Sequence, residues 1–137
     1  MKNNAVVLDS FAIIGFLKNE PSADIIQTIL HNANDSNQQL YMNTINFGEV
    51  IYTCLRQQGI AYAQLVESEM LQLPVNYVEN DWPLVKKAAF IKWNTPISYA
   101  NCFVAATAQQ FAAKIVTGDP EFKKLEHAFE IEWLPQR

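Results

Sequence analysis

The stretch AVVLDS at residues 5–10 decides the fold. Four consecutive apolar residues followed by an acid are typical of a strand that is buried on both faces of a sheet. A second predicted strand, KIVT at residues 114–117, is followed by Gly118 and then by Asp119. In a parallel sheet both acids would lie at the carboxyl edge, which is where ligands bind in α/β proteins.

The rest of the chain alternates between short apolar runs and segments with helical spacing. Strands are predicted at residues 40–42, 73–78 and 131–134, and helices at residues 11–18, 21–33, 44–59, 61–73, 81–92, 98–113 and, briefly, from 119. We expect Thr44 to cap the third of these helices and Ser98 to form a capping box with Asn101. The alternation predicts an α/β fold with a mainly parallel sheet and helices on both faces.

The composition suits one globular domain. The chain has 137 residues, of which 50% are hydrophobic and 18% are charged, so it can build a core and is not intrinsically disordered. No repeat or linker interrupts it, and we expect one domain over residues 1–137. Cys54 and Cys102 lie in apolar segments without a metal-binding spacing, which favours buried, reduced thiols and a cytoplasmic location.

The charge balance limits the possible partners. Ten Lys and Arg residues against 14 Asp and Glu give a net charge of −4, which argues against binding of nucleic acid by a broad basic surface. An enzyme that holds a phosphodiester through metal ions remains possible, because the ions supply the positive charge. The first apolar run ends at Asp9 after four residues and is too short for a signal peptide or a membrane span.

Four side chains whose oxygen atoms could bind a metal ion are expected near the carboxyl edge: Asp9, Glu49, Asn101 and Asp119. Each also has a simpler explanation. Asp9 and Asp119 are good helix caps, Asn101 fits the capping box, and a single Glu on a helix is usually solvated. Carboxylates gathered at about 4 Å repel by about 4 kcal/mol per pair, which a divalent cation would offset. Oxygen ligands without nearby His or Cys favour Mg²⁺ or Mn²⁺ over zinc.

Four blocks of sequence resemble the PIN-domain family in the family's order. They are residues 6–12, 46–52, 97–106 and 115–122, and they span nearly the whole chain. The chain length is similar to that of VapC-type ribonuclease toxins from bacterial toxin–antitoxin pairs. The resemblance implies a three-layer α/β/α sandwich around a mainly parallel sheet of about five strands.

The resemblance also implies a function and its residues. Asp9, Glu49, Asn101 and Asp119 would be the catalytic residues that bind Mg²⁺ or Mn²⁺, with Thr117 supporting them. The implied activity is metal-dependent hydrolysis of RNA as the toxin component of a toxin–antitoxin system. The implied partners are an RNA substrate, a cognate antitoxin protein and a second copy of the chain.

One residue departs from the family pattern. The third block normally reads Tyr-Ala-Asp, whereas this chain has Tyr99-Ala100-Asn101. The amide removes a negative charge and cannot act as a base, which fits either a naturally weakened member or a deliberate active-site substitution. The alternative function is therefore a catalytically inactive PIN-fold binding module. A phosphoacceptor signalling domain is a weaker rival, because Ser10 stands where a paired acid is needed.

Other polar and aromatic residues leave alternatives open. Three lysines on one predicted helix would contact an RNA backbone or simply form a solvated face: Lys86, Lys87 and Lys92. Four aromatic residues are expected to pack in the protein rather than stack on bases: Tyr41, Tyr52, Trp82 and Trp93. The apolar residues of the first half, from Ile13 to Leu30, are expected in the core, with a part available for a dimer face or an antitoxin groove.

Overall fold

The structure is a computed structural model that describes residues 4–35 and 38–136. Its elements follow one another as β1 (Ala5–Leu8), α1 (Ser10–Leu17), α2 (Ala23–Asp35), β2 (Gln39–Asn43), α3 (Thr44–Gln58), α4 (Ile60–Met70), β3 (Asn76–Val78), α5 (Trp82–Asn94), α6 (Tyr99–Phe111), β4 (Lys114–Thr117), the 3₁₀ helix η1 (Pro120–Leu125) and β5 (Ile131–Trp133).

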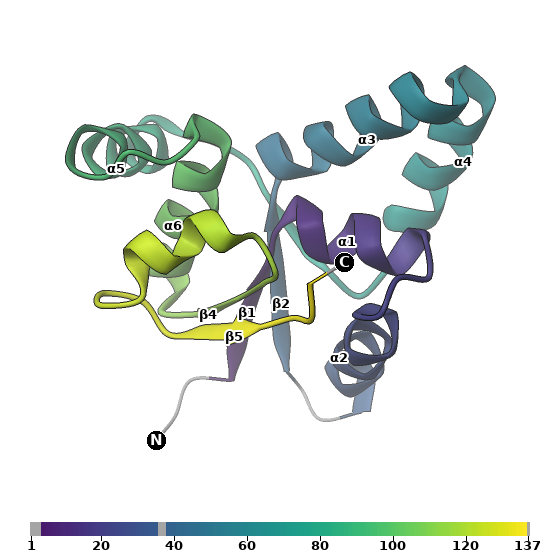
Figure 1. Cartoon of the computed structure of the whole chain (residues 1–137), viewed down its shortest axis with the longest axis horizontal. Helices are drawn as coiled ribbons and strands as arrows, with labels where there is room; N and C mark the ends of the chain where they lie inside the picture. Colours follow the sequence, from purple (N-terminus) through teal and green to yellow (C-terminus); the bar gives the residue numbers. More distant parts are fainter. Residues whose placement is uncertain (1–3, 36–37, 137) are drawn as a thin grey trace.

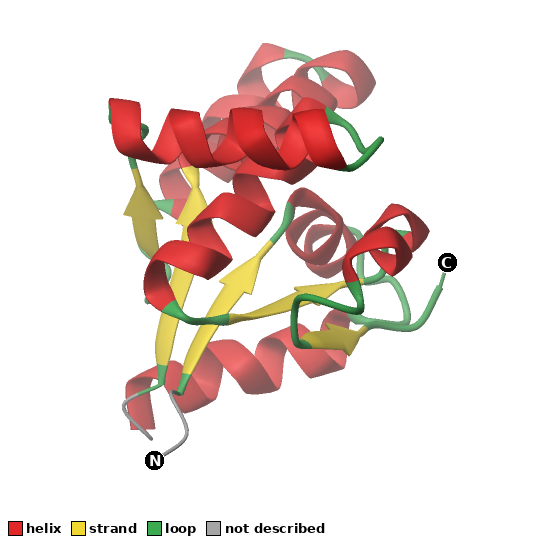
Figure 2. Cartoon of the chain, turned by 90° about the vertical axis from the view of Figure 1, so that its left-hand side faces the viewer, coloured by secondary structure: helices red, strands yellow, loops and turns green. Residues whose placement is uncertain are grey.

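The five strands form one sheet in the order β3-β2-β1-β4-β5, and every neighbouring pair is parallel. Helices cover both of its faces, with α1 to α4 on one side and α5, α6 and η1 on the other (Figures 1 and 2). Val6 and Leu8 of β1 belong to the first core cluster and Val7 to the second. The predicted α/β class, the sandwich and the five parallel strands are therefore confirmed.

Several predicted element boundaries were wrong, each for a local reason. β3 begins only at Asn76, because residues 71–74 form a turn. Asn43, not Thr44, caps α3, and its side-chain oxygen accepts a hydrogen bond from the Ile45 amide at 2.8 Å. An asparagine is a stronger N-cap than a threonine, so the helix starts one residue after it.

The prediction that the four aromatic residues pack inside the protein was wrong for three of them. Tyr41 stacks on Phe111 with ring centroids 4.0 Å apart. In contrast, Tyr52, Trp82 and Trp93 are 60%, 68% and 85% exposed. On α5, Leu84 and Ala88 form the buried face, and the two tryptophans project from the rest of the helix. Helix periodicity therefore outweighs the hydrophobicity of the individual rings.

The apolar residues of the first half mostly lie in the core. Ile13, Ile26, Ile29 and Leu30 are at most 7% exposed. Cys54 and Cys102 are free and buried, as expected. In the described part of the chain, no helix has both the length and the apolar character needed to cross a bilayer.

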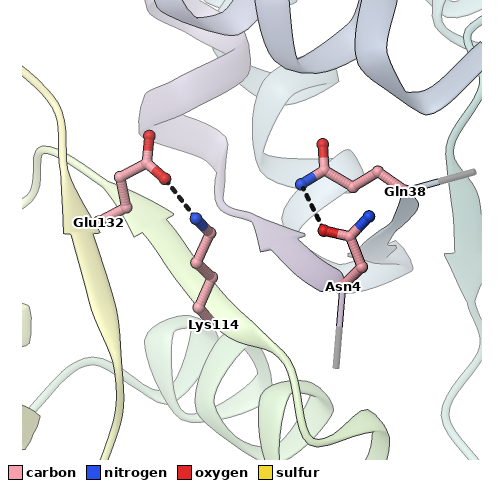
Figure 3. A network of polar contacts seen from close by, with 4 residues as sticks. All are labelled: Asn4, Gln38, Lys114 and Glu132. Atoms are coloured by element: carbon pink, nitrogen blue, oxygen red, sulfur yellow. Dashed lines mark hydrogen bonds and ion pairs between the residues drawn. The ribbon is translucent and has the colours of Figure 1, made fainter. Parts of the chain in front are cut away.

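Polar contacts join neighbouring elements near the amino ends of the strands (Figure 3). Lys114 Nζ lies 2.6 Å from Glu132 Oε1, an ion pair between β4 and β5. Gln38 Nε2 donates to Asn4 Oδ1 at 3.5 Å, where the chain enters β2 and β1. Among the residues that the structure describes, this edge has an ion pair and the carboxyl edge has none.

Candidate functional site

The site lies at the carboxyl edge of the sheet, where the strand order reverses. β1 lies between β2 and β4, so the segments that leave these strands diverge above its end. Asp9 follows β1, Thr117 ends β4, and Asp119 comes two residues later. Glu49 and Asn101 come from the first turns of α3 and α6. Parallel packing thus brings residues that are far apart in the sequence to one edge.

Asp9 is the most deeply placed acid, with only 2% of its surface exposed. Its Oδ1 accepts a hydrogen bond from the Ala12 amide at 2.9 Å and caps α1. Its Oδ2 accepts a short hydrogen bond from the Thr117 hydroxyl. The expected capping role is therefore present, and the second oxygen ties β1 to the end of β4.

Thr117 connects the two aspartates of the site. Its hydroxyl donates to Asp9, and the same oxygen accepts a hydrogen bond from the Asp119 amide at 2.9 Å. Asp119 Oδ1 in turn accepts from the Glu121 amide at 2.9 Å and caps η1. The threonine thus fixes the path of the chain that carries Asp119.

Asn101 joins Asp119 to a further acid, Glu121. Its side-chain Nδ2 donates to Asp119 Oδ2 at 3.1 Å and to Glu121 Oε1 at 2.7 Å. The same Glu121 oxygen accepts from the Ser98 amide at 2.8 Å. The side-chain amide of Asn101 therefore lies between the carboxylates of Asp119 and Glu121 and donates to both. A carboxylate at position 101 would repel them instead.

The capping box at Ser98 is only half formed. Ser98 Oγ accepts from the Asn101 amide at 3.2 Å, as predicted. The return bond to the Ser98 amide comes from Glu121 and not from the Asn101 side chain. The side-chain nitrogen of Asn101 points to Asp119 and Glu121, and the Glu121 carboxylate takes the Ser98 amide proton that a capping box would give to the Asn101 side-chain oxygen.

Glu49 is held by a buried asparagine that the sequence analysis did not single out. Asn46 Nδ2 donates to Glu49 Oε1 at 3.2 Å and to the Ala100 carbonyl at 3.1 Å, which joins α3 to α6. Asn46 is fully buried, and no described residue donates to its Oδ1. A buried oxygen without a donor is costly, and at this position it leaves an acceptor for a ligand or ion.

The electrostatics of the site are unfavourable without a cation. Burial raises the pKa of Asp9 from its ordinary 3.8 to about 7, although the bonds from Thr117 and Ala12 act to lower it. The negative charges of Asp119 and Glu49 add to the increase, so both act on Asp9 electrostatically. Within residues 4–35 and 38–136 no ion pair neutralises these acids. A buried acid with two partly exposed acids close enough to act on it is typical of functional sites.

Glu121 differs from Asp9 in the sign of its shift. Burial acts to raise its pKa, but hydrogen bonds from Ser98 and Asn101 and the charge of Lys124 outweigh it and lower the pKa. Glu121 therefore adds a stable negative charge next to Asn101. In the sequence, the signal that could have singled out Glu121 was its position two residues after Asp119. In the structure, the caps of η1 and α6 meet at this residue.

The donor set is suited in chemical type to a hard divalent cation. It consists of carboxylate, amide and hydroxyl oxygens, which Mg²⁺ and Mn²⁺ prefer. In the described part of the chain, however, no three His, Cys, Asp or Glu side chains are gathered closely enough to hold an ion. One of the four converging positions is an amide, and the aspartates are engaged as caps, so ion binding requires some of these side chains to turn.

The family comparison covers nearly all of the chain. The sequence matches the PIN domain family over residues 6–128. No curated protein sequence matches it.

Solved structures with a similar fold include toxin–antitoxin proteins. VapBC2 from Rickettsia felis, bound to a promoter DNA fragment, is similar at a TM-score of 0.74 and 14% identity, covering 96% of this chain and 99% of that one. A toxin–antitoxin complex from Klebsiella pneumoniae is similar at a TM-score of 0.70 and 12% identity, covering 93% of this chain and 95% of that one. VapC20 from Mycobacterium tuberculosis, a toxin that cleaves the sarcin–ricin loop, is similar at a TM-score of 0.69 and 13% identity, covering 95% of this chain and 99% of that one.

Proposed function

Because the chain belongs to the PIN-domain family, we propose that it is a metal-dependent endoribonuclease and the toxin of a toxin–antitoxin pair. The observation that carries the proposal is the buried Asp9, whose pKa rises to about 7 beside two further acids. Such a carboxylate is costly unless a cation accompanies it, and Mg²⁺ or Mn²⁺ is the cation that an oxygen donor set selects.

The proposed ligands are Asp9, Glu49, Asn101 and Asp119, with Thr117 holding the two aspartates in place. A divalent ion held there would supply Lewis acidity and would activate water for phosphodiester hydrolysis. Asp9 and Asp119 provide the negative charge, and Asn46 orients Glu49 through its side-chain amide. The likeness to VapC20, a toxin that cleaves RNA in the sarcin–ricin loop, supports RNA as the substrate.

Asn101 is expected to weaken the activity. As a neutral ligand it contributes one oxygen and no charge, and here its amide nitrogen is engaged by Asp119 and Glu121. The alternative is therefore a PIN-fold binding module without catalysis. Asn101→Asp distinguishes the two, because a charged ligand is expected to raise metal-dependent cleavage at least about tenfold, equivalent to about 1.4 kcal/mol.

Metal binding is tested by thermal melting in EDTA and in Mn²⁺. An ion that binds only the folded chain raises the melting temperature by mass action. We expect a clear increase for the parent chain, a larger one for Asn101→Asp and none for the Asp9→Ala, Asp119→Ala double variant. Glu132→Gln, at the opposite edge, is the matched control and should behave as the parent.

Cleavage is tested on a panel of RNAs with the same variants. The proposed function is wrong if Asn101→Asp stays at background cleavage while the double variant keeps the full metal shift. That pair of results would favour the binding module.

The proposed partners are a cognate antitoxin and a second copy of the chain. The likeness to a Klebsiella pneumoniae toxin–antitoxin complex supports the first. The gene product encoded next to this chain should copurify with it and suppress cleavage by Asn101→Asp. Unchanged cleavage in its presence would contradict the toxin assignment and leave the nuclease assignment standing. Light scattering of the purified chain tests the dimer.

A further inference from the structure

A large open groove lies on the α5 side of the molecule. Its volume is about 740 Å³, in the range of ligand-binding cavities. One wall is α5, and the other is the end of η1 with the residues that follow it. The groove lies outside the acidic site described above, and six side chains give it its chemical character: Lys86, Lys87, Phe90, Trp93, His127 and Phe129.

The charge of this groove is opposite to that of the whole chain. The protein carries a net charge of −4, yet none of the described residues that line the groove is Asp or Glu. Five of the ten Lys and Arg residues of the whole chain lie on α5 and η1. Lys86 and Lys87 are exposed, and neither forms an ion pair with a described residue. The groove therefore attracts anions on an otherwise acidic protein.

Exposed aromatic rings border the same groove. Trp93 is 85% exposed and Phe90 is 63% exposed, and they lie three residues apart on one face of α5. Lys86 Nζ lies 5.8 Å from the centre of the Phe90 ring. Rings beside unpaired lysines match the way in which proteins bind single-stranded nucleic acid, by stacking on bases and pairing with phosphates.

The groove is connected to the candidate site by η1. This helix begins at Pro120, is capped by Asp119 and carries Glu121 in its first turn, and it ends at Leu125, which lines the groove. Six residues of 3₁₀ helix span about 12 Å at about 2 Å per residue. The acids therefore lie at one end of η1, and Lys123 and Lys124 lie towards the other. A strand with one phosphate at the acidic site is therefore long enough to extend into the groove within a few nucleotides.

We propose that the α5 groove binds single-stranded RNA next to the cleavage site, with Trp93 and Phe90 stacking on bases and Lys86 and Lys87 binding phosphates. This inference rests on the proposed nuclease function and adds a substrate-binding surface to it. It also answers a physical problem, because the acids at the candidate site repel the phosphates of an RNA strand. The lysines of the groove would hold the parts of the strand that a metal ion at that site does not reach.

The test is binding of a fluorescently labelled oligouridine in EDTA, measured by anisotropy. Trp93→Ala should weaken binding about tenfold, since loss of one stacked base costs about 1–3 kcal/mol. Trp82→Ala is the matched control: the same residue type on the same helix, 68% exposed and outside the groove. It should bind as tightly as the parent. Both side chains are exposed, so neither variant should fail to fold.

The lysines are tested through the salt dependence of binding. The Lys86→Gln, Lys87→Gln double variant should lower the slope of log K against log salt by about 1.4, for two phosphate contacts on a single strand. Lys114→Gln, at the far edge of the sheet, should leave the slope unchanged.

Three results would overturn the inference. One is equal RNA affinity for Trp93→Ala and the parent, including no binding by either. Another is conversion of a dimer to a monomer by Trp93→Ala, which would make the groove an interface between copies. The third is that Trp93→Ala no longer binds the protein encoded by the adjacent gene but still binds RNA as tightly as the parent. Each leaves the proposed function intact, because the Mn²⁺ melting shift and the cleavage by Asn101→Asp test that separately.

Discussion

The two edges of the parallel sheet treat charge in opposite ways. At the amino edge, Lys114 and Glu132 form a pair with 30% and 38% of their side chains exposed. At the carboxyl edge, Asp9 is buried beside other acids, and its pKa rises because of that burial. The first arrangement costs little and contributes little, whereas the second is unfavourable by itself. Proteins accept such a cost at functional sites, and for that reason we place the function at the carboxyl edge.

The largest expected effect concerns Asp9 and pH. Its folded-state pKa of about 7 exceeds its ordinary value of 3.8, so folding favours the protonated acid. The associated stability is fully present below about pH 4 and is lost as the pH rises to 7. At about 1.4 kcal/mol per pKa unit, the loss approaches about 4 kcal/mol. Urea unfolding in EDTA, compared at each pH with Asp9→Asn, isolates this term. A constant difference between the two proteins from pH 4 to 7 would contradict it.

The next effect is the cost of a carboxylate at position 101. Asn101→Asp removes the donor to Asp119 and Glu121 and places a third charge beside them. Without metal, the free energy of unfolding should fall by roughly 3 kcal/mol, from the lost bonds to charged groups and the new repulsion. Adding Glu121→Gln should recover a large part of this loss. Additive effects of the two substitutions in a double-mutant cycle would show that Glu121 does not act on position 101.

A smaller effect is expected at Gly118, between Thr117 and Asp119. A Cβ at this position would lie 2.3 Å from a ring carbon of Phe11. Gly118→Ala should therefore cost about 1–3 kcal/mol by overpacking, and Phe11→Leu should relieve part of it. Gly48→Ala, in the exposed part of α3 with nothing within 4 Å, is the matched control. It should stabilise by about 0.5–1 kcal/mol, since alanine favours the helix. Equal effects at both glycines in denaturant melts would rule out the contact.

The smallest effect belongs to the amino edge. Lys114→Gln and Glu132→Gln should each change the unfolding free energy by less than about 1 kcal/mol, because a partly exposed ion pair is screened by solvent. The difference should shrink further in high salt. A loss as large as that from Asn101→Asp would remove the contrast between the two edges.

The sequence by itself determined the layers and the positions of the acids. The alternation of short strands and helices predicted a mainly parallel sheet, and the aspartates that follow strands 5–8 and 114–117 were then expected at its carboxyl edge, where the structure has them. Hydrophobic period and turn residues are local properties of a chain, so they carry this information without a structure. The order of the four PIN-like blocks carried the family in the same way, and the family match confirms it.

Only the tertiary structure decided which groups meet. Asn46 reaches Glu49 and the start of α6, and Glu121 takes the place of the Asn101 side chain in capping Ser98. The tertiary structure also leaves Trp93 exposed beside Lys86 and Lys87, whereas the sequence predicted that its ring packs in the protein. These contacts join segments far apart in the chain, and they depend on how α3, α5, α6 and η1 are oriented around the sheet. Local patterns fix which residues face the core, but the choice among polar partners at an edge is made by the packing of whole elements.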